Sequence, residues 1–480
     1  MFTRYKPLSR CLIKKIVVRQ SSTASNVKTS STSSSILAPS THQHDLRLTM
    51  NKLIKNLSIQ SLPDFQKTLK SNNDNNNNLN SNAEDTLRCL LILLAKRLER
   101  LSSLSFIMLM NPHMAKIWDA YLNSYNELIG FISKYSNLNE ENIFKNIINF
   151  KFLNSNEQNL EFVKVLHDIM EMHTDNVIDL RDGIHEAKST FVTTNSSYDD
   201  TSDETFFAGF SEKQFLDEHL SERVLMRLIA NNFILLFENP KSNGILDKNL
   251  NVLDVLTRSI EFVNDLSNLK YYEKFEVIVN TRIIDKFGNY HIEENINLKN
   301  LKNHSKIIFP YIGNHIEYVL NEILKNSARA VIENNKNIPV KILIILDKSN
   351  FKNKTPTLQI KISDVGGGIK SHVLEKLWEY SFTTVNNSKS SSSNNNEIIS
   401  TRSGKDVELG AAHDLGFGTS SGSEIGNNEG ADTLVGDNII AGMGYGLPLS
   451  LTYCRLFGGD IKLHTVWGYG TDVYVVLKGI

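Results

Sequence analysis

The feature that most constrains the fold of this chain is an asparagine-bearing helix followed by a glycine-flanked aspartate. Apolar residues over 316–331 recur at intervals of three and four, which predicts a helix with one stripe packed on a sheet. Glu322, Asn326 and Arg329 share another face of that helix. The segment 364–368, Asp-Val-Gly-Gly-Gly, follows a predicted strand. This order predicts a helix that forms the floor of a nucleotide site.

The polar face of this helix carries the right groups for phosphate chemistry. An amide oxygen suits a Mg²⁺ ion that keeps most of its waters and bridges to phosphates. A buried asparagine on an apolar-faced helix needs a polar partner, so we expect Asn326 to be buried and to ligate Mg²⁺. Glu322 lies one turn earlier, where a carboxylate can deprotonate a nucleophile, and it is the candidate general base.

Two later glycine clusters complete the pattern. Residues 442–447, Gly-Met-Gly-Tyr-Gly-Leu, precede an apolar helix predicted over 448–457, and backbone N–H groups at a helix N-terminus can approach phosphate. Residues 468–472 lead into a strand predicted over 473–477. A single Gly-x-Gly-x-Gly is more often a turn, but four such elements in this order indicate a nucleotide site.

The amino-acid sequences of these motifs resemble those of the mitochondrial 2-oxoacid dehydrogenase kinases. This family includes the pyruvate dehydrogenase and branched-chain 2-oxoacid dehydrogenase kinases. These kinases share the Bergerat ATP-binding fold with histidine kinases, gyrase-type ATPases and Hsp90-type chaperones. The resemblance covers residues 87–480 apart from polar inserts. It is carried by Glu-Ile-Leu-Lys-Asn-Ser-Ala-Arg-Ala (322–330), Ile-Ser-Asp-Val-Gly-Gly-Gly-Ile (362–369), Ala-Gly-Met-Gly-Tyr-Gly-Leu-Pro-Leu-Ser (441–450) and Gly-Thr-Asp-Val-Tyr (470–474).

The resemblance implies ATP and Mg²⁺ as cofactors and assigns roles along the site. Asp364 is expected to accept the exocyclic amine of adenine, which selects adenine over guanine. Gly366 and Gly368 let the backbone pass close to the base. The remaining residues expected at the nucleotide are Arg329, Thr383, Thr384, Gly442, Met443, Gly444, Tyr445, Gly446, Leu447 and Thr471.

We predict an α + α/β fold, with a four-helix-bundle-like domain over 49–270 followed by a Bergerat-type α/β sandwich over 271–480. The first domain carries polar inserts near 71–82 and 189–203, and the second a low-complexity lid insert near 386–438. Apolar periodicity predicts helices over 87–101, 114–135, 160–172 and 215–237. β-branched and aliphatic runs predict strands over 275–280, 340–346, 358–363, 461–465 and 472–478, covered by helices on one face.

Composition excludes several classes of function. The chain has 480 residues and a formal net charge of −1, which gives no reason to expect nucleic acid as a partner. Cys11, Cys89 and Cys454 lie far apart and form no Cys-x-x-Cys pair, so neither a disulfide framework nor a zinc site is expected. No apolar run approaches the ~20 residues that cross a bilayer, so no membrane span is predicted.

Residues 1–48 have the character of a mitochondrial transit peptide followed by a linker. Basic and hydroxyl residues are frequent, and no acidic residue precedes Asp45. The alternative is a basic tail without a targeting role. Together with the resemblance, this segment predicts a location in the mitochondrial matrix.

The resulting hypothesis is a protein-serine kinase that phosphorylates and inactivates the E1 α-subunit of pyruvate dehydrogenase. The branched-chain enzyme is the alternative, because Tyr318 stands where pyruvate dehydrogenase kinases have a histidine. The family also implies a homodimer and the lipoyl domain of the E2 core as a partner. The chain stops at Ile480 without the extension that pyruvate dehydrogenase kinases exchange between subunits, so lipoyl docking by that route is not expected.

Rival classes remain. One is a nucleotide-sensing regulatory protein of the complex that does not phosphorylate it, which an intact Glu322 disfavours. Another is a Bergerat ATPase or chaperone, which the Arg329-Ala330 and Gly-Leu-Pro wording disfavours. His173 invites comparison with histidine kinases, but no Arg-Thr-Pro-like continuation follows it, and a structural or phosphate-orienting role is the expectation.

Overall fold

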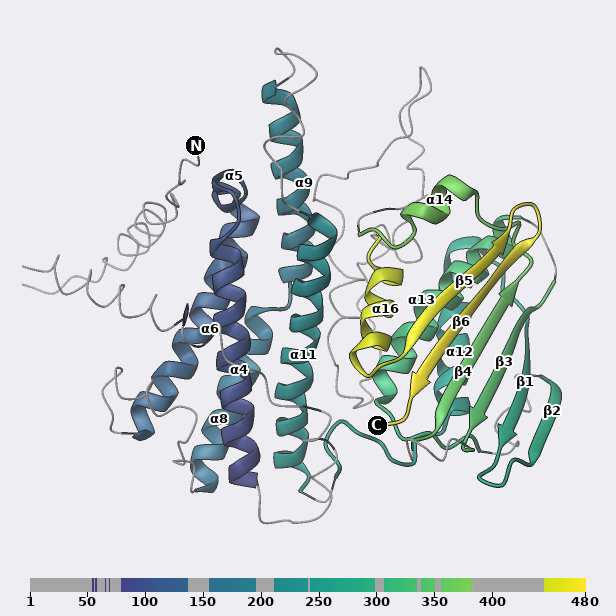
Figure 1. Ribbon diagram of the computed structural model, residues 1–480, viewed down its shortest axis with the longest axis horizontal. Helices are drawn as coiled ribbons and strands as arrows, with labels where there is room; N and C mark the ends of the chain where they lie inside the picture. The colour runs from purple at the N-terminus through teal and green to yellow at the C-terminus, as the bar shows by residue number, and fades with distance from the viewer. Residues whose placement is uncertain are drawn as a thin grey trace, which may run out of the picture. The chain divides into compact units, whose positions relative to one another are not determined.

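The computed structural model forms two compact units, which divide between Ala208 and Gly209, with segment 64–78 grouped in the second (Figure 1). None of the helices it describes is both long and apolar enough to cross a membrane. The structure describes residues 79–136, 155–195, 211–240, 242–297, 306–334, 338–349, 355–380 and 444–480, together with Ile54, Lys55, Leu57, Phe65, Leu69 and Phe382.

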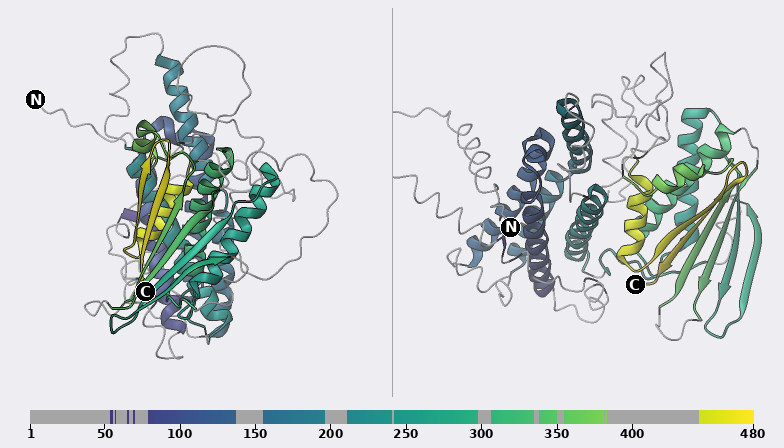
Figure 2. Two further views of the ribbon diagram at one scale, coloured as in Figure 1. Left: turned by 90° about the vertical axis from the view of Figure 1, so that its right-hand side faces the viewer. Right: turned by 45° about the horizontal axis from the view of Figure 1, so that its top comes forward.

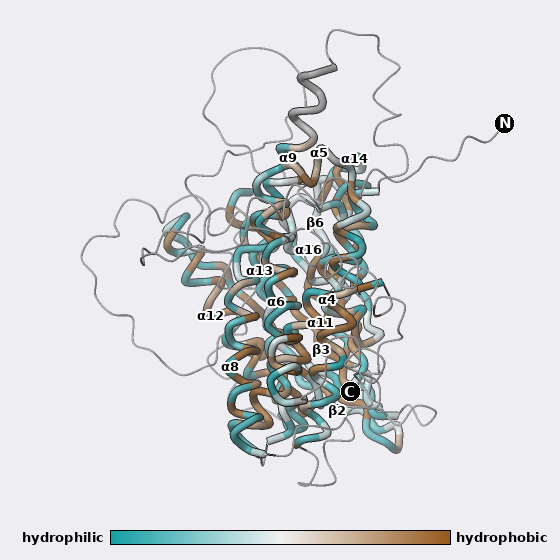
Figure 3. The backbone as a smooth tube through the Cα atoms, turned by 90° about the vertical axis from the view of Figure 1, so that its left-hand side faces the viewer, coloured by the Kyte–Doolittle hydropathy of each residue, from teal (hydrophilic) through white to brown (hydrophobic). Residues whose placement is uncertain are grey.

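The first unit is built from helices whose apolar faces pack on one another. Helix α6 contacts α4, α8 and α9, so it lies at the centre of the unit. Leu90, Leu94, Leu98 and Leu101 repeat at helical spacing along α4 and are all buried. Figure 3 shows the resulting alternation of hydrophobic and hydrophilic stretches along these helices. The described helices are α4 (Leu79–Ser102), α5 (Phe106–Met110), α6 (Pro112–Ser136), α8 (Asn156–Met172) and α9 (Asn176–Asn195).

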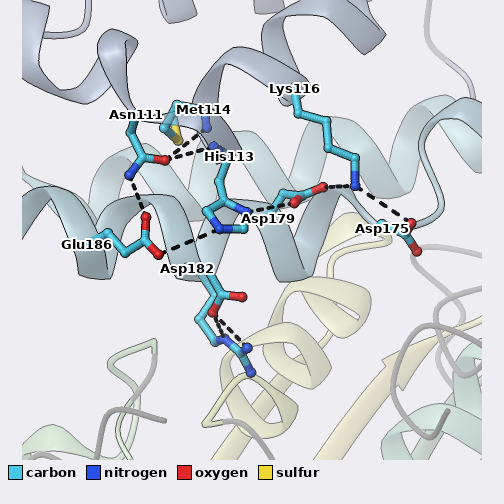
Figure 4. A network of polar contacts seen from close by, with 9 residues as sticks. Asn111, His113, Met114, Lys116, Asp175, Asp179, Asp182 and Glu186 are labelled. Carbon is cyan, nitrogen blue, oxygen red and sulfur yellow. Dashed lines mark hydrogen bonds and ion pairs between the residues drawn. The ribbon is translucent and has the colours of Figure 1, made fainter. Parts of the chain in front are cut away.

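Polar contacts fasten the start of α6 to α9 (Figure 4). His113 Nδ1 lies 2.9 Å from Asp179 Oδ1, and Lys116 Nζ lies 2.8 Å from Asp179 Oδ2. Asn111 Nδ2 donates a hydrogen bond to Glu186 Oε2 at 2.9 Å, while Asn111 Oδ1 accepts from the backbone N–H of His113. Asp179 is 5% exposed, so these bonds satisfy a carboxylate that packing has removed from water.

The second unit contains a six-stranded sheet in the order β2-β1-β3-β4-β6-β5. Strands β1 and β3 pair in parallel, and the other neighbours pair antiparallel. The strands are β1 (Val277–Ile284), β2 (Tyr290–Asn297), β3 (Val340–Asp347), β4 (Thr357–Asp364), β5 (Asp460–Val466) and β6 (Gly470–Lys478). The described helices of this unit are α11 (Glu212–Glu238), α12 (Val252–Tyr271), α13 (Gly313–Glu333), α14 (Ser371–Lys376) and α16 (Gly446–Leu456).

One face of the sheet is covered by helices α12, α13 and α16 (Figures 1 and 2). Alternate residues of β3 point to that face and are fully buried, including Ile342, Ile344 and Leu346. The stripe predicted on α13 is also buried, and α13 contacts strand β4: Ile316, Val319, Leu320, Ile323 and Val331 are all buried. Burial of this stripe fixes the rotation of α13, and therefore decides which of its residues face away from the sheet.

The structure confirms a mixed helical and sheet protein, and a helix or strand occurs at each position where the sequence predicts one. Strand β2 was not predicted, because the polar run Glu293-Glu294-Asn295 interrupts the alternation of apolar and polar residues that marks a strand. The division into compact units groups α11 and α12 with the sheet, whereas the predicted domain boundary lies at 270. The predicted targeting segment 1–48 and the lid insert near 386–438 lie outside the described residues, as do most of the inserts near 71–82 and 189–203.

Candidate nucleotide site

Helix α13 presents a charged pair on the face that it turns away from the sheet. Lys325 Nζ lies 2.5 Å from Glu322 Oε1, one turn along the same helix. The two side chains retain only 10% and 12% of their exposure, so this ion pair is largely removed from water. The candidate general base is thus held by a lysine that stands in the sequence directly before the candidate metal ligand, Asn326.

The N-terminus of α16 lies against the same carboxylate. A Cβ built on Gly446, the first residue of α16, would overlap Glu322 Oε2. Gly444 two residues earlier has φ +77°, a conformation that favours glycine. Glycine at these positions therefore permits both the turn into the helix and the close approach of α13.

Tyr445, between these glycines, is buried and braced from a second element. Its ring centroid lies 5.4 Å from that of Tyr380, whose hydroxyl donates a 2.7 Å hydrogen bond to Asp217 Oδ1 on α11. Burial and the neighbouring Asp217 raise the pKa of Tyr380, which keeps this hydroxyl protonated as a donor. The start of α16 is therefore fixed to α11 by packing and one hydrogen bond.

Asn326 is exposed, which corrects the expectation that it is buried. Asn326 was expected on the face of Glu322 and Arg329, and burial of the α13 stripe turns that face outward at position 326. An exposed amide oxygen one turn after Glu322 fits a Mg²⁺ ion that keeps several waters, because such an ion needs few protein ligands. No group of three or more histidine, cysteine, aspartate or glutamate side chains suited to a metal occurs among the described residues.

Arg329 lies on the same side of α13 as Glu322 and Asn326, but its guanidinium already has a partner. Arg329 Nε donates to Glu333 Oε1 at 2.8 Å, and the Tyr271 hydroxyl of α12 donates to the same oxygen at 2.9 Å. This arrangement ties α13 to α12 as well as presenting a cation beside the site.

Asp364 ends β4 and is 7% exposed. Its Oδ1 accepts a 3.0 Å hydrogen bond from the N–H of Gly366, and its Oδ2 accepts a 3.2 Å bond from the Ser327 hydroxyl of α13. Burial raises the pKa of the Asp364 carboxyl above its ordinary value, and these hydrogen bonds act in the opposite direction. In the β4–β6 register Asp364 pairs with Thr471, so two residues far apart in the sequence meet at this end of the sheet.

The glycines after Asp364 are required by close backbone contacts. A Cβ on Gly366 would overlap Ala330 of α13, and Asn334 Nδ2 donates to the Gly366 carbonyl at 2.7 Å. Gly368 has φ +73°, and a Cβ there would overlap the Val466 carbonyl. The loop that carries Gly366 and Gly368 therefore packs between α13 and the β5–β6 hairpin.

The structure thus brings most of the predicted site together at one end of the second unit. Glu322, Gly446, Asp364, Gly366 and Thr471 are connected through α13, the β4 loop and β6 by the contacts above. Leu447 follows Gly446 in the first turn of α16 and is half-buried. Thr383, Thr384, Gly442 and Met443 lie outside the described residues.

Sequence reasoning missed three polar residues of the site: Ser327, Lys325 and Asn334. Ser327 bonds Asp364, Lys325 pairs with Glu322, and Asn334 bridges the Ala330 and Gly366 carbonyls. The helical spacing of Glu322 and Lys325 was a usable signal for the ion pair. The other two contacts depend on how the β4 loop meets α13, which no local pattern encodes.

His173 belongs to the first unit and is buried. Its two ring nitrogens lie 2.9 Å from Ser124 Oγ and 2.6 Å from Asn176 Nδ2, and its ring centroid lies 4.4 Å from that of Tyr121. A histidine engaged in this way is poorly suited to accept a phosphoryl group, which agrees with the expectation of a structural role.

Comparison with known proteins supports the same class of protein. A family model described as mitochondrial branched-chain alpha-ketoacid dehydrogenase kinase matches residues 56–254. Pyruvate dehydrogenase (acetyl-transferring) kinase 1, mitochondrial, of Saccharomyces cerevisiae is 26% identical over 402 residues, which are 82% of this chain and 77% of that protein. Pyruvate dehydrogenase (acetyl-transferring) kinase isozyme 4, mitochondrial, of Homo sapiens is 25% identical over 345 residues, which are 66% of this chain and 67% of that protein.

These matches support a kinase. The chain is similar to the mitochondrial 2-oxoacid dehydrogenase kinases, through a family model over residues 56–254 and through relatives that are 25–26% identical.

Proposed function

We propose that this protein is a Mg-ATP-dependent protein-serine kinase of the mitochondrial matrix that phosphorylates and inactivates the E1 α-subunit of the pyruvate dehydrogenase complex. The observation that carries the proposal is the contact between Glu322 and Gly446, which puts a carboxylate against the N-terminus of α16. A helix N-terminus favours phosphate, so a base beside it can reach a hydroxyl that attacks a bound triphosphate.

The nucleotide lies in a Bergerat-type site in this proposal. Asp364 accepts the exocyclic amine of adenine, since Ser327 and the Gly366 N–H hold its carboxylate in a fixed position. Gly366 and Gly368 keep the loop close to the base, and Thr471 of β6 stands beside Asp364 in the sheet. The described residues Gly444, Tyr445, Gly446 and Leu447 offer backbone to the phosphates, with Arg329 as a nearby cation. Thr383, Thr384, Gly442 and Met443 are assigned to the same nucleotide by the family resemblance.

Asn326 would hold Mg²⁺ through its amide oxygen, and the ion would neutralise charge on the phosphates. Glu322 accepts the proton of the substrate serine as the serine oxygen bonds to the γ-phosphorus. The bond between that phosphorus and the oxygen bridging to the β-phosphate breaks, and ADP leaves. Most of the acceleration comes from positioning and charge stabilisation, and the proton transfer adds the ~10²- to 10⁴-fold typical of a general base.

The substrate assignment is supported by the relatives, which are named as pyruvate dehydrogenase kinases. The branched-chain 2-oxoacid dehydrogenase is the second candidate, because the matching family model carries that name. As partners we propose the E1 α-subunit, the lipoyl domain of the E2 core and a second copy of this chain. A regulatory protein that binds nucleotide without transferring phosphate is the alternative of another class.

The deciding experiment incubates the full chain with Mg-ATP and each purified E1 in turn, and follows both phosphoserine and loss of E1 activity. Glu322→Gln is the control for contaminating kinases. Faster phosphorylation of the pyruvate enzyme supports the proposal, and faster phosphorylation of the branched-chain enzyme selects the second candidate. Nucleotide binding without phosphorylation of either E1 favours the regulatory protein.

A further inference from the structure

The ion pair of Glu322 and Lys325 has a consequence for the proposed reaction, on which this inference rests. The Lys325 ammonium lies 2.5 Å from Glu322 Oε1, so it occupies a lone pair that a base needs. The second oxygen, Oε2, lies against Gly446, where there is no room for a Cβ. A serine hydroxyl that approaches Glu322 must therefore share Oε1 with the Lys325 ammonium or reach Oε2 beside Gly446, and release of Lys325 opens Oε1 to it.

Lys325 is suited to such a release. An ammonium on a four-carbon stem has three donors and can reorient without a change in the backbone. The pair joins positions three apart on one helix, so α13 does not have to unwind for the two groups to separate. Both side chains are about nine-tenths buried, so an ammonium that leaves Glu322 needs another anion rather than water.

A bound triphosphate supplies that anion. Contact between Gly446 and Glu322 means that phosphates at the first turn of α16 lie beside the carboxylate that holds Lys325. A triphosphate carries more negative charge than one carboxylate, so it competes for the ammonium. Transfer of the ammonium also reduces the repulsion between Glu322 and the phosphates.

We propose that Lys325 is a nucleotide-responsive lock on the general base: it pairs with Glu322 and moves to the triphosphate when nucleotide binds, which frees Glu322 to accept the serine proton. The same lysine then has two roles, because it restrains the base and contributes to phosphate affinity. It makes proton acceptance depend on a bound triphosphate.

The test is a double-mutant cycle on the full chain, read by calorimetric titration with Mg-ATP and with AMP. Lys325→Met removes the charge at similar volume, and it is expected to weaken Mg-ATP binding roughly 10- to 100-fold, as for loss of one charge-assisted hydrogen bond. AMP affinity should stay unchanged, because AMP has no triphosphate. Lys325→Arg should recover most of the Mg-ATP affinity, since it restores a cation.

Glu322→Gln tests the lock itself. It should tighten Mg-ATP binding by a few fold when Lys325 is present, because the ammonium no longer has to leave a carboxylate. The gain should vanish when Lys325→Met is added. Lys134→Met is the matched control, because Lys134 forms an ion pair with Glu161 at 2.6 Å in the first unit. Circular dichroism establishes that each variant is folded.

The inference fails if Lys325→Met binds Mg-ATP as tightly as wild type, or if Glu322→Gln gains the same affinity with and without Lys325. Equal loss of Mg-ATP and AMP affinity in Lys325→Met also overturns it, because that result means a general disturbance of the site. A wild-type protein that binds no Mg-ATP contradicts the proposed function itself, and this is a different outcome from the other three.

Discussion

Gly446 of α16 lies directly against Glu322 of α13, because a Cβ built on Gly446 would overlap Glu322 Oε2. The two residues are more than a hundred positions apart in the sequence, and the low-complexity segment near 386–438 lies between them in the chain. Their contact makes the first turn of α16 part of the environment of the proposed general base.

Gly446→Ala is therefore expected to impair catalysis more than stability. The obstructed atom is the end of a flexible side chain, so Glu322 can move aside at little cost to the fold. A displaced base is expected to lower turnover about 10²-fold, the loss typical of a misplacement of about 1 Å. Steady-state phosphorylation of E1 measures the effect, and thermal melting measures stability. Gly130→Ala on α6 is the control, because no atom lies within 4 Å of a Cβ there. Equal turnover of the two variants would contradict the role given to this contact.

Asn326→Ala tests the proposed role of Asn326 as a metal ligand. Asn326 is exposed on α13, and alanine has the higher helix propensity, so the variant should fold as well as wild type. Loss of the amide oxygen should abolish most kinase activity and raise the Mg²⁺ concentration needed for the remainder. Asn268→Ala, at an exposed position of α12, is the control and should leave both quantities unchanged. Turnover like wild type by a folded Asn326→Ala protein would rule out the metal role.

Asp364→Asn is expected to weaken nucleotide binding without lowering the stability of the fold at neutral pH. The asparagine retains an oxygen for the Gly366 N–H, and the Ser327 hydroxyl can reverse to accept a bond. Burial raises the pKa of Asp364 in the folded protein above its value in the unfolded chain, which is near 3.8. The contribution of Asp364 to the free energy of unfolding therefore decreases as pH rises above 3.8. The variant should then be at least as stable as wild type at neutral pH and relatively less so in acid.

Denaturant titrations at pH 4 and pH 7 check this stability difference, and calorimetry with Mg-ATP checks binding. ATP affinity should fall sharply, because an amide that donates a hydrogen bond toward the adenine amine opposes it. A variant that is destabilised more at pH 7 than at pH 4 would show that the carboxylate is favoured by its surroundings. If the variant binds ATP as tightly as wild type, Asp364 does not bind adenine.

Local periodicity was enough to predict α13, its buried stripe and five of the six strands. These elements are encoded within short windows, since apolar spacing decides both their type and the face they bury. Strand β2 escaped because five of its eight residues are polar or charged and its partner β1 is what holds it in the sheet. Its pairing is a tertiary property.

The candidate site was predictable as a set of residues but not as a geometry. Motif order gave Glu322, Asp364 and Gly446, whereas their contacts arise from loops that meet across the fold. The exposure of Asn326 was predicted wrongly because a polar residue near an apolar stripe was assumed to share its burial. Only the rotation of α13 on the sheet decides that question. The ion pair of Glu322 and Lys325 was not predicted, although the spacing of three residues on one helix favours it.

His315 provides a test of the packing beneath the site. Its ring is 1% exposed and lies in α13, with its centroid 4.4 Å from the ring of Tyr453 and 5.8 Å from that of Phe457 on the α16 side. Burial lowers the pKa of His315 to about 3. The unfolded chain therefore takes up a proton at this residue below about pH 6.5, whereas the folded protein takes it up only near pH 3. Between about pH 6.5 and pH 3, His315 therefore lowers the free energy of unfolding as pH falls.

His315→Phe should remove this dependence, because phenylalanine fits among aromatic rings and does not titrate. Between pH 6.5 and pH 4.5 the free energy of unfolding of wild type should fall by about 2–3 kcal/mol more than that of the variant, at about 1.4 kcal/mol for each pH unit. Denaturant titrations across this range measure the two slopes. His464→Phe, at an exposed position of β5, is the control and should keep the slope of wild type. Parallel slopes for wild type and His315→Phe would mean that His315 is protonated within the fold, and that water or an anion reaches the layer between α13 and α16.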